Sequence, residues 1–417
     1  MAKARGLWRG AFKPLTPAPA QPLNVLWLID HVCYDGNLHG GGRLYMNLLP
    51  RFDPALVRIH PYFLRASDEV RQLFADAGHP VRTLDIGKYD PTGPLRIAAL
   101  CRQHHIDVMH LCCYASSTLG RIVGAVKGIP SVLHDFDTQV YFGYPLFLKI
   151  LDRLLASRTD HAFAASAYCK EYMRDVRRIP GDRIEVLYHA VPESLLELRP
   201  RLDRAGARAS VGLRDELVFC VVTKLGPERG NETLLKAFAK VRQARPDARL
   251  VLVYQPTLYH RLPKEYESIP WARDPVEMRA RIERVIAELN LSDSVRMVES
   301  TVHPEAWYAA SDVMIAPFES IRFSSVHLVE GMAYGRPHVV TALGEPLELV
   351  QLYGGGVAVP AGDVEAMAGA MLAIGNDPVL RSELGRKARL GAEELTVDAV
   401  AARLSRLYRS LHERAPR

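Results

Sequence analysis

The sequence predicts two α/β domains, each built on a parallel, doubly wound sheet. Three observations predict this fold class. The chain has 417 residues, more than one ordinary hydrophobic core accommodates. Short apolar runs alternate with amphipathic segments along two successive stretches, which is typical of parallel sheets with crossover helices. A charged stretch without periodicity, 199–216, separates the two series, as expected of an interdomain connection.

The first series opens with an apolar strand, 23–30, followed by three consecutive glycines and a helix. Gly40, Gly41 and Gly42 are expected to form a loop between strand and helix, because glycine tolerates conformations that other residues avoid. Further strand–helix units and a closing strand complete the domain. Its later strands are expected at 57–64, 106–113, 130–136, 161–166 and 183–194, and its helices at 44–52, 67–77, 116–127, 145–155 and 167–176.

The second series repeats this architecture, with an irregular insertion at 255–275. Open parallel sheets bind ligands beyond the carboxyl ends of their strands, so two facing sheets predict one ligand cleft between the domains. Shorter units continue to about residue 380. The strands are expected at 217–225, 248–255, 295–300, 313–317 and 338–342, and the helices at 231–244, 276–289, 304–311 and 325–334.

The domain boundary is expected near 192–205, where the charged connection begins. A basic terminal helix is expected at the end of the chain, and a return of this helix to the first domain is one option. The predicted parts are a flexible basic leader at 1–22, a first domain at 23–195, a second domain at 196–400 and the terminal helix at 401–417.

The formal charge of +6 is concentrated at the two ends of the chain. Residues 1–22 and 401–417 each carry a net +4, so residues 23–400 sum to −2. A nearly neutral body is a poor partner for nucleic acid, whose binding depends on neutralising phosphates. Basic ends suit either solubilising tails or peripheral contact with an anionic membrane surface.

Cysteine usage and hydropathy indicate a cytoplasmic protein. None of the six cysteines falls in a Cys-x-x-Cys or Cys/His spacing that holds zinc, so they are expected as small buried side chains in a reducing compartment. No run approaches the roughly 18 to 20 apolar residues of a membrane span. The N-terminus lacks the apolar core of a secretory signal.

The fourth helix of the first series is amphipathic. Leu146, Ile150 and Leu154 share one face, and we expect this face to pack on the sheet as in a crossover helix. Lys149 and Arg153 lie one turn apart on the same helix. The alternative is therefore a contact with a lipid-linked acceptor at a membrane surface.

Two cations lie where a strand of the second series gives way to a helix. Lys224 ends the strand, and Arg229 with Gly230 directly precedes the helix. Unpaired N–H groups at a helix start, the helix dipole and fixed cations all favour concentrated negative charge. This pattern predicts a diphosphate site, and the alternative is a pair of surface cations beside a loop.

A second segment combines a helix start with a carboxylate. The helix is expected to begin at Ser324 or Ser325, capped by a serine hydroxyl, and His327 and Glu330 lie close to one face of it. A carboxylate in this place accepts hydrogen bonds from a pair of vicinal hydroxyls, as on a ribose. The alternative is an ordinary surface glutamate.

These segments resemble the retaining GT-B glycosyltransferases of family 4. VVTKLGPERGNETLLKAFAKV, FSSVHLVEGMAYGRPHVV and GEPLELVQLYGGGVAVPAGDVEAMAGAM resemble three successive segments of the second domain in that family. In the first half, GGGRLYMNLL, IDVMHLCC, PSVLHDFD, AASAYCKEYM and RIEVLYHAVPE are similar to family motifs in the family's order. The resemblance covers about residues 23–415 and implies a GT-B fold, two Rossmann-like domains facing a central cleft.

The resemblance implies a role for each matching residue. Lys224 and Arg229 would bind the diphosphate of the sugar donor and stabilise the leaving group. Glu330 would hold the ribose hydroxyls. His134 matches a histidine that contacts the donor sugar near the reacting carbon, and the alternative for it is a structural role. Further donor contacts are implied for the first-domain loop, at Gly41 and Gly42, and for the backbone N–H groups at the start of the later helix, at Ser324, Ser325 and Val326.

The implied reaction moves a sugar, with retention of configuration, from a nucleotide sugar such as a UDP- or GDP-sugar. No other cofactor and no metal is expected, because Lys224 and Arg229 would neutralise the charge that grows on the diphosphate. The acceptor stays open between a glycan, a lipid-linked molecule and a small molecule. The oligomeric state stays open as well.

The departures from the family pattern bear on activity. Many members carry a glutamate near the position of Arg322, eight residues before the ribose-binding glutamate. Thr223 and Tyr254 stand where the family has glycine, and His189 with Ala190 replaces asparagine and glycine. These changes favour an alternative, an inactive nucleotide-sugar-binding homologue or a partner subunit in glycan assembly. An epimerase on the same fold also stays open.

Overall fold

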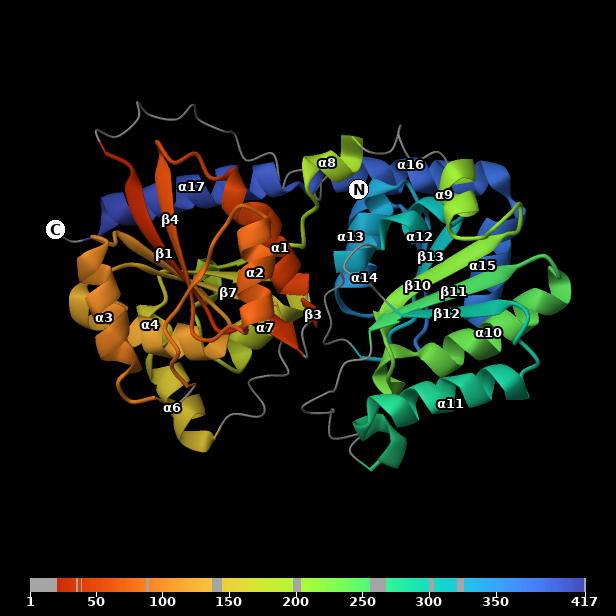
Figure 1. The fold of residues 1–417 in the computed structure, drawn as a ribbon, viewed down its shortest axis with the longest axis horizontal. Helices are drawn as coiled ribbons and strands as arrows, with labels where there is room; N and C mark the ends of the chain where they lie inside the picture. Colours follow the sequence, from red (N-terminus) through yellow and green to blue (C-terminus); the bar gives the residue numbers. More distant parts are fainter. Residues whose placement is uncertain are drawn as a thin grey trace.

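The computed structural model describes residues 21–34, 37–38, 40–87, 90–136, 145–197, 204–255, 268–299, 304–320 and 326–415. Within these residues the chain forms two α/β domains, which lie side by side in Figure 1. Each is built on one parallel sheet covered by helices on both faces. The predicted fold class is therefore confirmed.

The N-terminal sheet has seven strands in the order β5-β4-β1-β6-β7-β8-β9, all paired in parallel. Apolar side chains on both of its faces are buried in separate clusters, as expected for a sheet between two helix layers. The strands are β1 (Leu23–Ile29), β4 (Val57–Phe63), β5 (Arg82–Thr83), β6 (Val108–Cys112), β7 (Ser131–Asp135), β8 (His161–Ala164) and β9 (Ile184–Val186), with a small hairpin of β2 (Cys33–Tyr34) and β3 (Asn37–Leu38). The helices are α1 (Gly40–Leu48), α2 (Asp68–Asp76), α3 (Gly93–Gln103), α4 (Tyr114–Lys127), α6 (Leu146–Leu154) and α7 (Ala167–Asp175).

Besides the hairpin of β2 and β3, two elements of this domain lie outside the predicted set. Strand β5 is only two residues long and sits at the sheet edge. Helix α3 begins among Pro91, Gly93 and Pro94, residues that are typical of loops. Proline is nevertheless well placed there, because the first turn of a helix needs no N–H partner.

The C-terminal sheet has six parallel strands in the order β12-β11-β10-β13-β14-β15. The strands are β10 (Val218–Lys224), β11 (Arg249–Gln255), β12 (Val295–Glu299), β13 (Val313–Ala316), β14 (His338–Thr341) and β15 (Gly356–Val359). The helices are α8 (Glu193–Glu197), α9 (Arg204–Ser210), α10 (Asn231–Ala244), α11 (Pro275–Glu288), α12 (Glu305–Ala310), α13 (Val326–Ala333), α14 (Gly344–Tyr353), α15 (Val364–Asn376), α16 (Pro378–Glu394) and α17 (Val397–Arg414).

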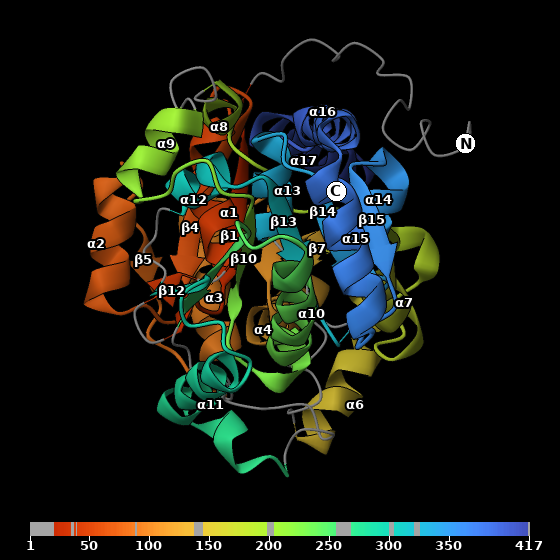
Figure 2. The same ribbon diagram turned by 90° about the vertical axis from the view of Figure 1, so that its right-hand side faces the viewer.

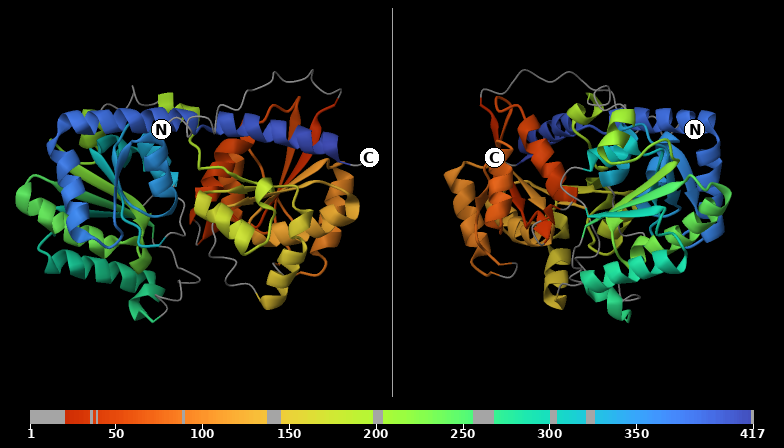
Figure 3. Two further views of the ribbon diagram at one scale, coloured as in Figure 1. Left: turned by 180° about the vertical axis from the view of Figure 1, so that it is seen from behind. Right: turned by 45° about the vertical axis from the view of Figure 1, so that its right-hand side comes forward.

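The last helix, α17, packs on the N-terminal domain although it follows the C-terminal one (Figure 3). Its apolar side chains join the core cluster that contains Trp27 and Phe52. The helix begins at Val397, because the Thr396 hydroxyl caps it by accepting from the amide of Ala399. The boundary expected at residue 401 therefore lies inside the helix.

Helix α6 is turned over relative to the predicted packing. Leu146, Ile150 and Leu154, expected against the sheet, are 72%, 49% and 71% exposed. That prediction was wrong. The residue of α6 that is buried is Asp152, because it forms ion pairs with two buried arginines, Arg121 and Arg177. The helix projects at the end of the molecule opposite to α16 and α17 (Figures 1 and 2).

Those two arginines belong to a buried network beneath the sheet. Arg177 donates to both carboxylate oxygens of Asp152, at 2.8 and 3.0 Å, and also contacts Asp135, the last residue of β7. Arg121 of α4 pairs with Asp152 as well. Burial alone would raise the pKa of Asp152, but Arg177 and Arg121 hold it below its ordinary value. Two cations and two carboxylates thus compensate one another in a place without solvent.

Candidate active site

A glycine-dependent turn positions the two predicted cations. Lys224 is the last residue of β10, and a short 3-10 turn, Pro227–Arg229, leads through Gly230 into α10. Gly230 has a φ of +65°, and a Cβ there would lie 1.8 Å from the carbonyl oxygen of Pro317. Only glycine fits this close approach. The side chain of Asn231 fixes the strand end by donating to the carbonyl of Lys224 at 3.2 Å.

Arg229 is held near the sheet edge by a buried carboxylate and a ring. Its side chain is 12% exposed, and its Nε lies 3.6 Å from an oxygen of Glu228. Its guanidinium carbon lies 5.6 Å from the centre of the Phe318 ring. Glu228 is fully buried, and its oxygens accept no hydrogen bond from the described residues. Sequence reasoning missed Glu228, because nothing local indicates that this charged residue turns inward.

Glu330 is buried on α13, and both of its oxygens are engaged. Arg43 of α1 lies 2.6 Å from Oε1, and the hydroxyl of Tyr308 donates to Oε2 at 2.7 Å. Nδ1 of His327 lies 3.3 Å from Oε2. Burial alone would raise the pKa of Glu330, but Arg43 and His327 hold it below its ordinary value. The predicted ribose carboxylate is thus ionised and bonded to the other domain.

His134 lies in β7 one residue before the carboxyl end of the strand. It was expected to face the cleft, and in the structure it is wholly buried. The ring of Phe136 lies 4.4 Å away and that of Tyr45, from α1, lies 6.1 Å away. Burial lowers the pKa of His134 to about 3, so the imidazole is neutral at physiological pH. Its Nδ1 lies 3.1 Å from Nε2 of His110, and its Nε2 has no hydrogen-bond partner among the described residues.

The predicted glycine loop is part of a helix. Gly41 and Gly42 belong to the first turn of α1, which begins at Gly40, and both are buried. The prediction of a loop was wrong because glycine, although a poor helix former, is tolerated where a helix start is packed closely. A Cβ on Gly40 would lie 3.5 Å from the side chain of Val326, the first residue of α13. The starts of two helices from different domains therefore meet; Ser324 and Ser325 lie outside the described residues.

The domains are also joined at a second place. Glu348 of α14 accepts from the amide of Ala167, at the start of α7, at 2.9 Å. It accepts from the hydroxyl of Tyr188 as well, at 3.0 Å. Together with the pair of Arg43 and Glu330, these contacts fix the carboxyl edges of the two sheets relative to one another. Glu330 and Val326 thus lie where α1, with Gly41 and Gly42, meets α13, and the His134 ring lies beside Tyr45 of α1. The turn that carries Arg229 contacts the segment before α13, through Pro317 and Glu319.

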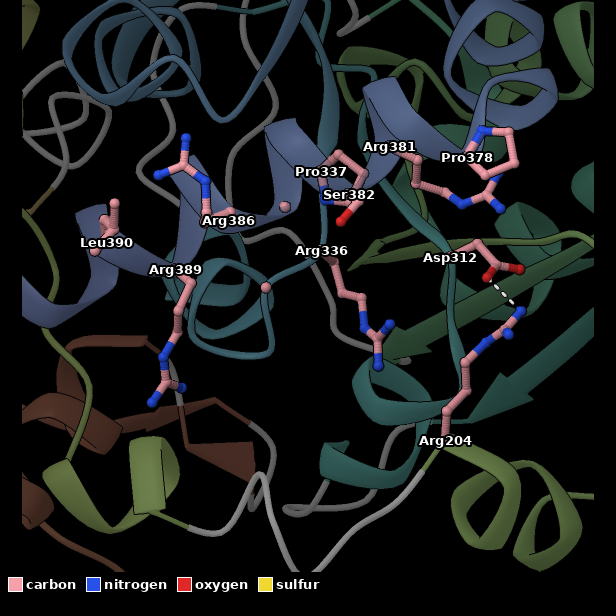
Figure 4. A pocket seen from close by; sticks show the side chains of 12 residues that line it. Arg204, Asp312, Arg336, Pro337, Pro378, Arg381, Ser382, Arg386, Arg389 and Leu390 are labelled. Atoms are coloured by element: carbon pink, nitrogen blue, oxygen red, sulfur yellow. Dashed lines mark hydrogen bonds and ion pairs between the residues drawn. The ribbon is translucent and has the colours of Figure 1, made fainter.

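An arginine-lined pocket of about 490 Å³ lies elsewhere on the C-terminal domain. Its guanidinium groups point in different directions (Figure 4). Arg336 donates to the carbonyls of Tyr308 and Ala309, and Arg381 donates to those of Ile374 and Gly375. These cations stabilise helix ends, whose carbonyls lack partners within the helix. No predicted site residue lines this pocket.

One cluster of potential metal ligands lies near the candidate site. Ligand atoms of His110, Cys112 and His134 come within 4.8 Å of one another. Both nitrogens of His110 are already hydrogen-bonded, and burial raises the pKa of the Cys112 thiol well above its ordinary value. Histidine binds a metal through a free imidazole nitrogen and cysteine binds one as a thiolate, so this set, hydrogen-bonded as it is, does not fit a metal. A second possible ligand near this cluster is Asp135, the first residue of an Asp-Phe-Asp sequence. Its carboxylate is already paired with the buried Arg177.

Two family models match the chain in succession. "Glycosyltransferase Family 4" matches residues 40–195, and "Glycosyl transferases group 1" matches residues 203–391. The first covers most of the N-terminal domain, and the second covers the C-terminal sheet with its helices.

Individual proteins agree with these matches. The D-inositol 3-phosphate glycosyltransferase of Kribbella flavida is 28% identical over 348 residues, which are 76% of this chain and 74% of that protein. The alpha-D-kanosaminyltransferase of Streptomyces kanamyceticus is 20% identical over 302 residues, 70% of this chain and 73% of the other. The crystal structure of Anabaena Alr3699/HepE in complex with UDP has the same fold, with a TM-score of 0.75 at 16% identity over 93% of this chain and 100% of that one. The chain is a GT-B glycosyltransferase that belongs to the glycosyl transferases group 1, with an N-terminal domain of the family 4 type.

Proposed function

We propose that the protein transfers a sugar from a nucleoside-diphosphate sugar to an acceptor, with retention of configuration. One observation carries the proposal. The turn that bears Lys224 and Arg229 abuts the segment before α13, since the amide of Glu319 donates to the carbonyl of Glu228 at 3.0 Å. Glu330 of α13 is in turn paired with α1 of the other domain. Retention is inferred from the resemblance to retaining enzymes.

Lys224 and Arg229 would act on the leaving group. As the bond between the sugar carbon and the phosphate oxygen breaks, negative charge grows on the nucleoside diphosphate and positive charge on the sugar. Cations that are already fixed at a half-buried edge stabilise this charge without reorganising during the reaction. We therefore assign no metal to the reaction, and no cofactor beyond a UDP- or GDP-sugar.

The ribose would bind to Glu330 only after a rearrangement. Because Arg43 occupies one oxygen of Glu330 and Tyr308 the other, ribose hydroxyls compete with both for this carboxylate. A ribose that displaces Arg43 from Glu330 would loosen the contact between α1 and α13, and so between the two domains. Binding of the sugar donor would thus be coupled to a change in how the domains meet, as is common where closure excludes water.

A panel of UDP- and GDP-sugars, with the free nucleotides beside them, tests the proposal. We expect the compounds of one nucleoside, either uridine or guanosine, to raise the Tm of the protein at millimolar concentration. A ligand that binds only the folded state stabilises that state. We also expect slow hydrolysis of the matching sugar, measured as released nucleotide. Stabilisation without any turnover would favour the inactive, binding-only homologue. If no nucleotide changes Tm, the proposed donor class is wrong.

We further propose that the protein works at the inner face of the membrane, with α6 on an anionic lipid surface. Leu146, Phe147, Ile150 and Leu154 expose an apolar face on this nine-residue helix. Arg153 is exposed on the same helix. An amphipathic helix with basic residues binds anionic lipid through both its apolar area and its charge. No described helix is long and apolar enough to cross a membrane.

Vesicle flotation tests this surface. The double variant Phe147→Gln and Leu154→Gln should bind about tenfold more weakly to vesicles that contain phosphatidylglycerol. The reason is that two apolar side chains no longer insert into the lipid. Leu95→Gln, at a leucine of α3 that is 73% exposed, is the matched control and should bind normally. Equal binding by all three proteins would refute the lipid contact. A change of oligomeric state in the double variant alone would instead assign the face to self-association.

A further inference from the structure

Four buried side chains form a hydrogen-bonded line that ends at His134. Nε1 of Trp27 donates to the hydroxyl of Tyr408 at 3.0 Å, and this hydroxyl lies 2.7 Å from Nδ1 of His110. Nε2 of His110 lies 3.1 Å from Nδ1 of His134. All four side chains have no exposed surface. The line joins β1, α17, β6 and β7, so its members come from both ends of the chain.

Trp27 fixes one direction in this line, and a Tyr408 hydroxyl that donates to His110 fixes the others. An indole N–H can only donate, so the Tyr408 oxygen accepts from Trp27. A phenol oxygen can accept twice, so the bond from Trp27 does not by itself place the Tyr408 proton; donation to Nδ1 of His110, the other described neighbour of that hydroxyl, is the arrangement that gives this proton an acceptor. His110 consequently carries its single proton on Nε2 and donates it to Nδ1 of His134. That leaves the proton of His134 on Nε2.

This assignment requires both imidazoles to be neutral. Burial lowers the pKa of His134 to about 3, and burial together with His134 lowers that of His110 well below its ordinary value. A second proton on either ring would leave two donors facing one another in the line. The indole of Trp27 also stacks on the His110 ring, with centroids 4.6 Å apart, and so fixes its plane.

We propose that Tyr408 is a positioning residue that holds His134 as the Nε2–H tautomer, so that His134 presents a hydrogen-bond donor and not a base. Nε2 of His134 has no partner among the described residues, and a buried N–H without an acceptor is costly. A hydroxyl or ring oxygen of the donor sugar supplies that acceptor. This last step rests on the proposed function, whereas the tautomer does not.

The tautomer assignment has a mechanistic consequence. A neutral imidazole whose Nδ1 already accepts from His110 has no free lone pair for an incoming proton. His134 therefore does not remove the proton of the acceptor hydroxyl. Helix α17, which returns from the C-terminal domain, supplies Tyr408, the residue that sets the tautomer of His134. The packing of α17 on the N-terminal domain therefore controls which atom of His134 can donate a hydrogen bond.

Tyr408→Phe tests the proposal, because it removes one oxygen and keeps the ring. Long-range ¹H–¹⁵N spectra of protein labelled in histidine should show His134 protonated at Nε2 in the wild type, with the signal assigned by its loss in His134→Gln. In Tyr408→Phe, His110 is released and His134 should become a mixture of tautomers. With an active sugar donor, kcat should fall about tenfold, the size of one neutral hydrogen bond, while KM for that donor stays within about twofold.

Tyr334→Phe is the matched control. Tyr334 is also buried, at 3% exposed, but its hydroxyl has no hydrogen-bond partner in the described part of the chain. This variant should leave both the spectrum and kcat unchanged. A wild-type His134 protonated at Nδ1, or a Tyr408→Phe spectrum identical to the wild type, would overturn the proposal. The spectra need no substrate, so a failure of the proposed transferase activity would not obscure the result.

Discussion

Replacing Lys224 with alanine is expected to lower kcat for sugar transfer by about 10²- to 10³-fold, the usual effect of removing one preorganised group from a site of growing charge. Lys224 ends β10, with two residues between it and the turn that carries Arg229, and under the proposed function the two cations act on one diphosphate. The loss should appear in kcat more than in KM, because the charge is greatest in the transition state. Steady-state kinetics with the donor found by the nucleotide panel measures it.

Lys240→Ala is the matched control for this experiment. Lys240 lies on the helix that follows, where it pairs with Glu365 at 2.7 Å and is 45% exposed. This variant should keep wild-type kinetics. Lys224→Arg keeps the charge and should recover part of the activity. Full activity of Lys224→Ala would show that this cation has no part in the reaction, and a lowered Tm in that variant would indicate a structural role instead.

Patterns local in the chain predict the fold well. Strands buried on both faces read as continuous apolar runs, and the strand predicted at 217–225 is observed as Val218–Lys224. Boundaries chosen from composition are less accurate than those set by capping. Helix α17 shows this, because its start is decided by the hydroxyl of Thr396 and not by the basic residues that follow.

Contacts between distant elements are what local patterns miss. The periodicity of α6 correctly predicts a helix, but its orientation depends on ion pairs that Asp152 makes with residues of other elements. Glu330 was predicted from its helix, whereas its partner Arg43 comes from the other domain. The line through Tyr408 likewise requires α17 to return to the first sheet. Side-chain partners of this kind depend on tertiary packing, which no spacing in the sequence encodes.

The buried network beneath β7 is expected to control the stability of the N-terminal domain. Arg177→Met should lower the free energy of unfolding by about 3 to 5 kcal/mol, because removing one partner leaves a buried charge uncompensated. Asp135 and Asp152 would then share Arg121 alone among the buried cations described here. Calorimetry should show this as a fall of roughly 10 °C in the transition assigned to that domain.

Arg174→Met is the matched control, because Arg174 is three residues away, on α7, and forms an exposed ion pair with Asp175. An exposed pair contributes little to stability, so this variant should unfold like the wild type. If Arg177→Met has the same free energy of unfolding as the wild type, Asp135 and Asp152 must be neutralised by protons or hydrated by water at no cost in stability. Asp135 directly follows His134 in β7, so we also expect Arg177→Met to disturb the Nε2–H tautomer in the protein that remains folded. The same ion pairs that turn α6 outward would thereby hold the end of β7, where we propose that the donor sugar binds.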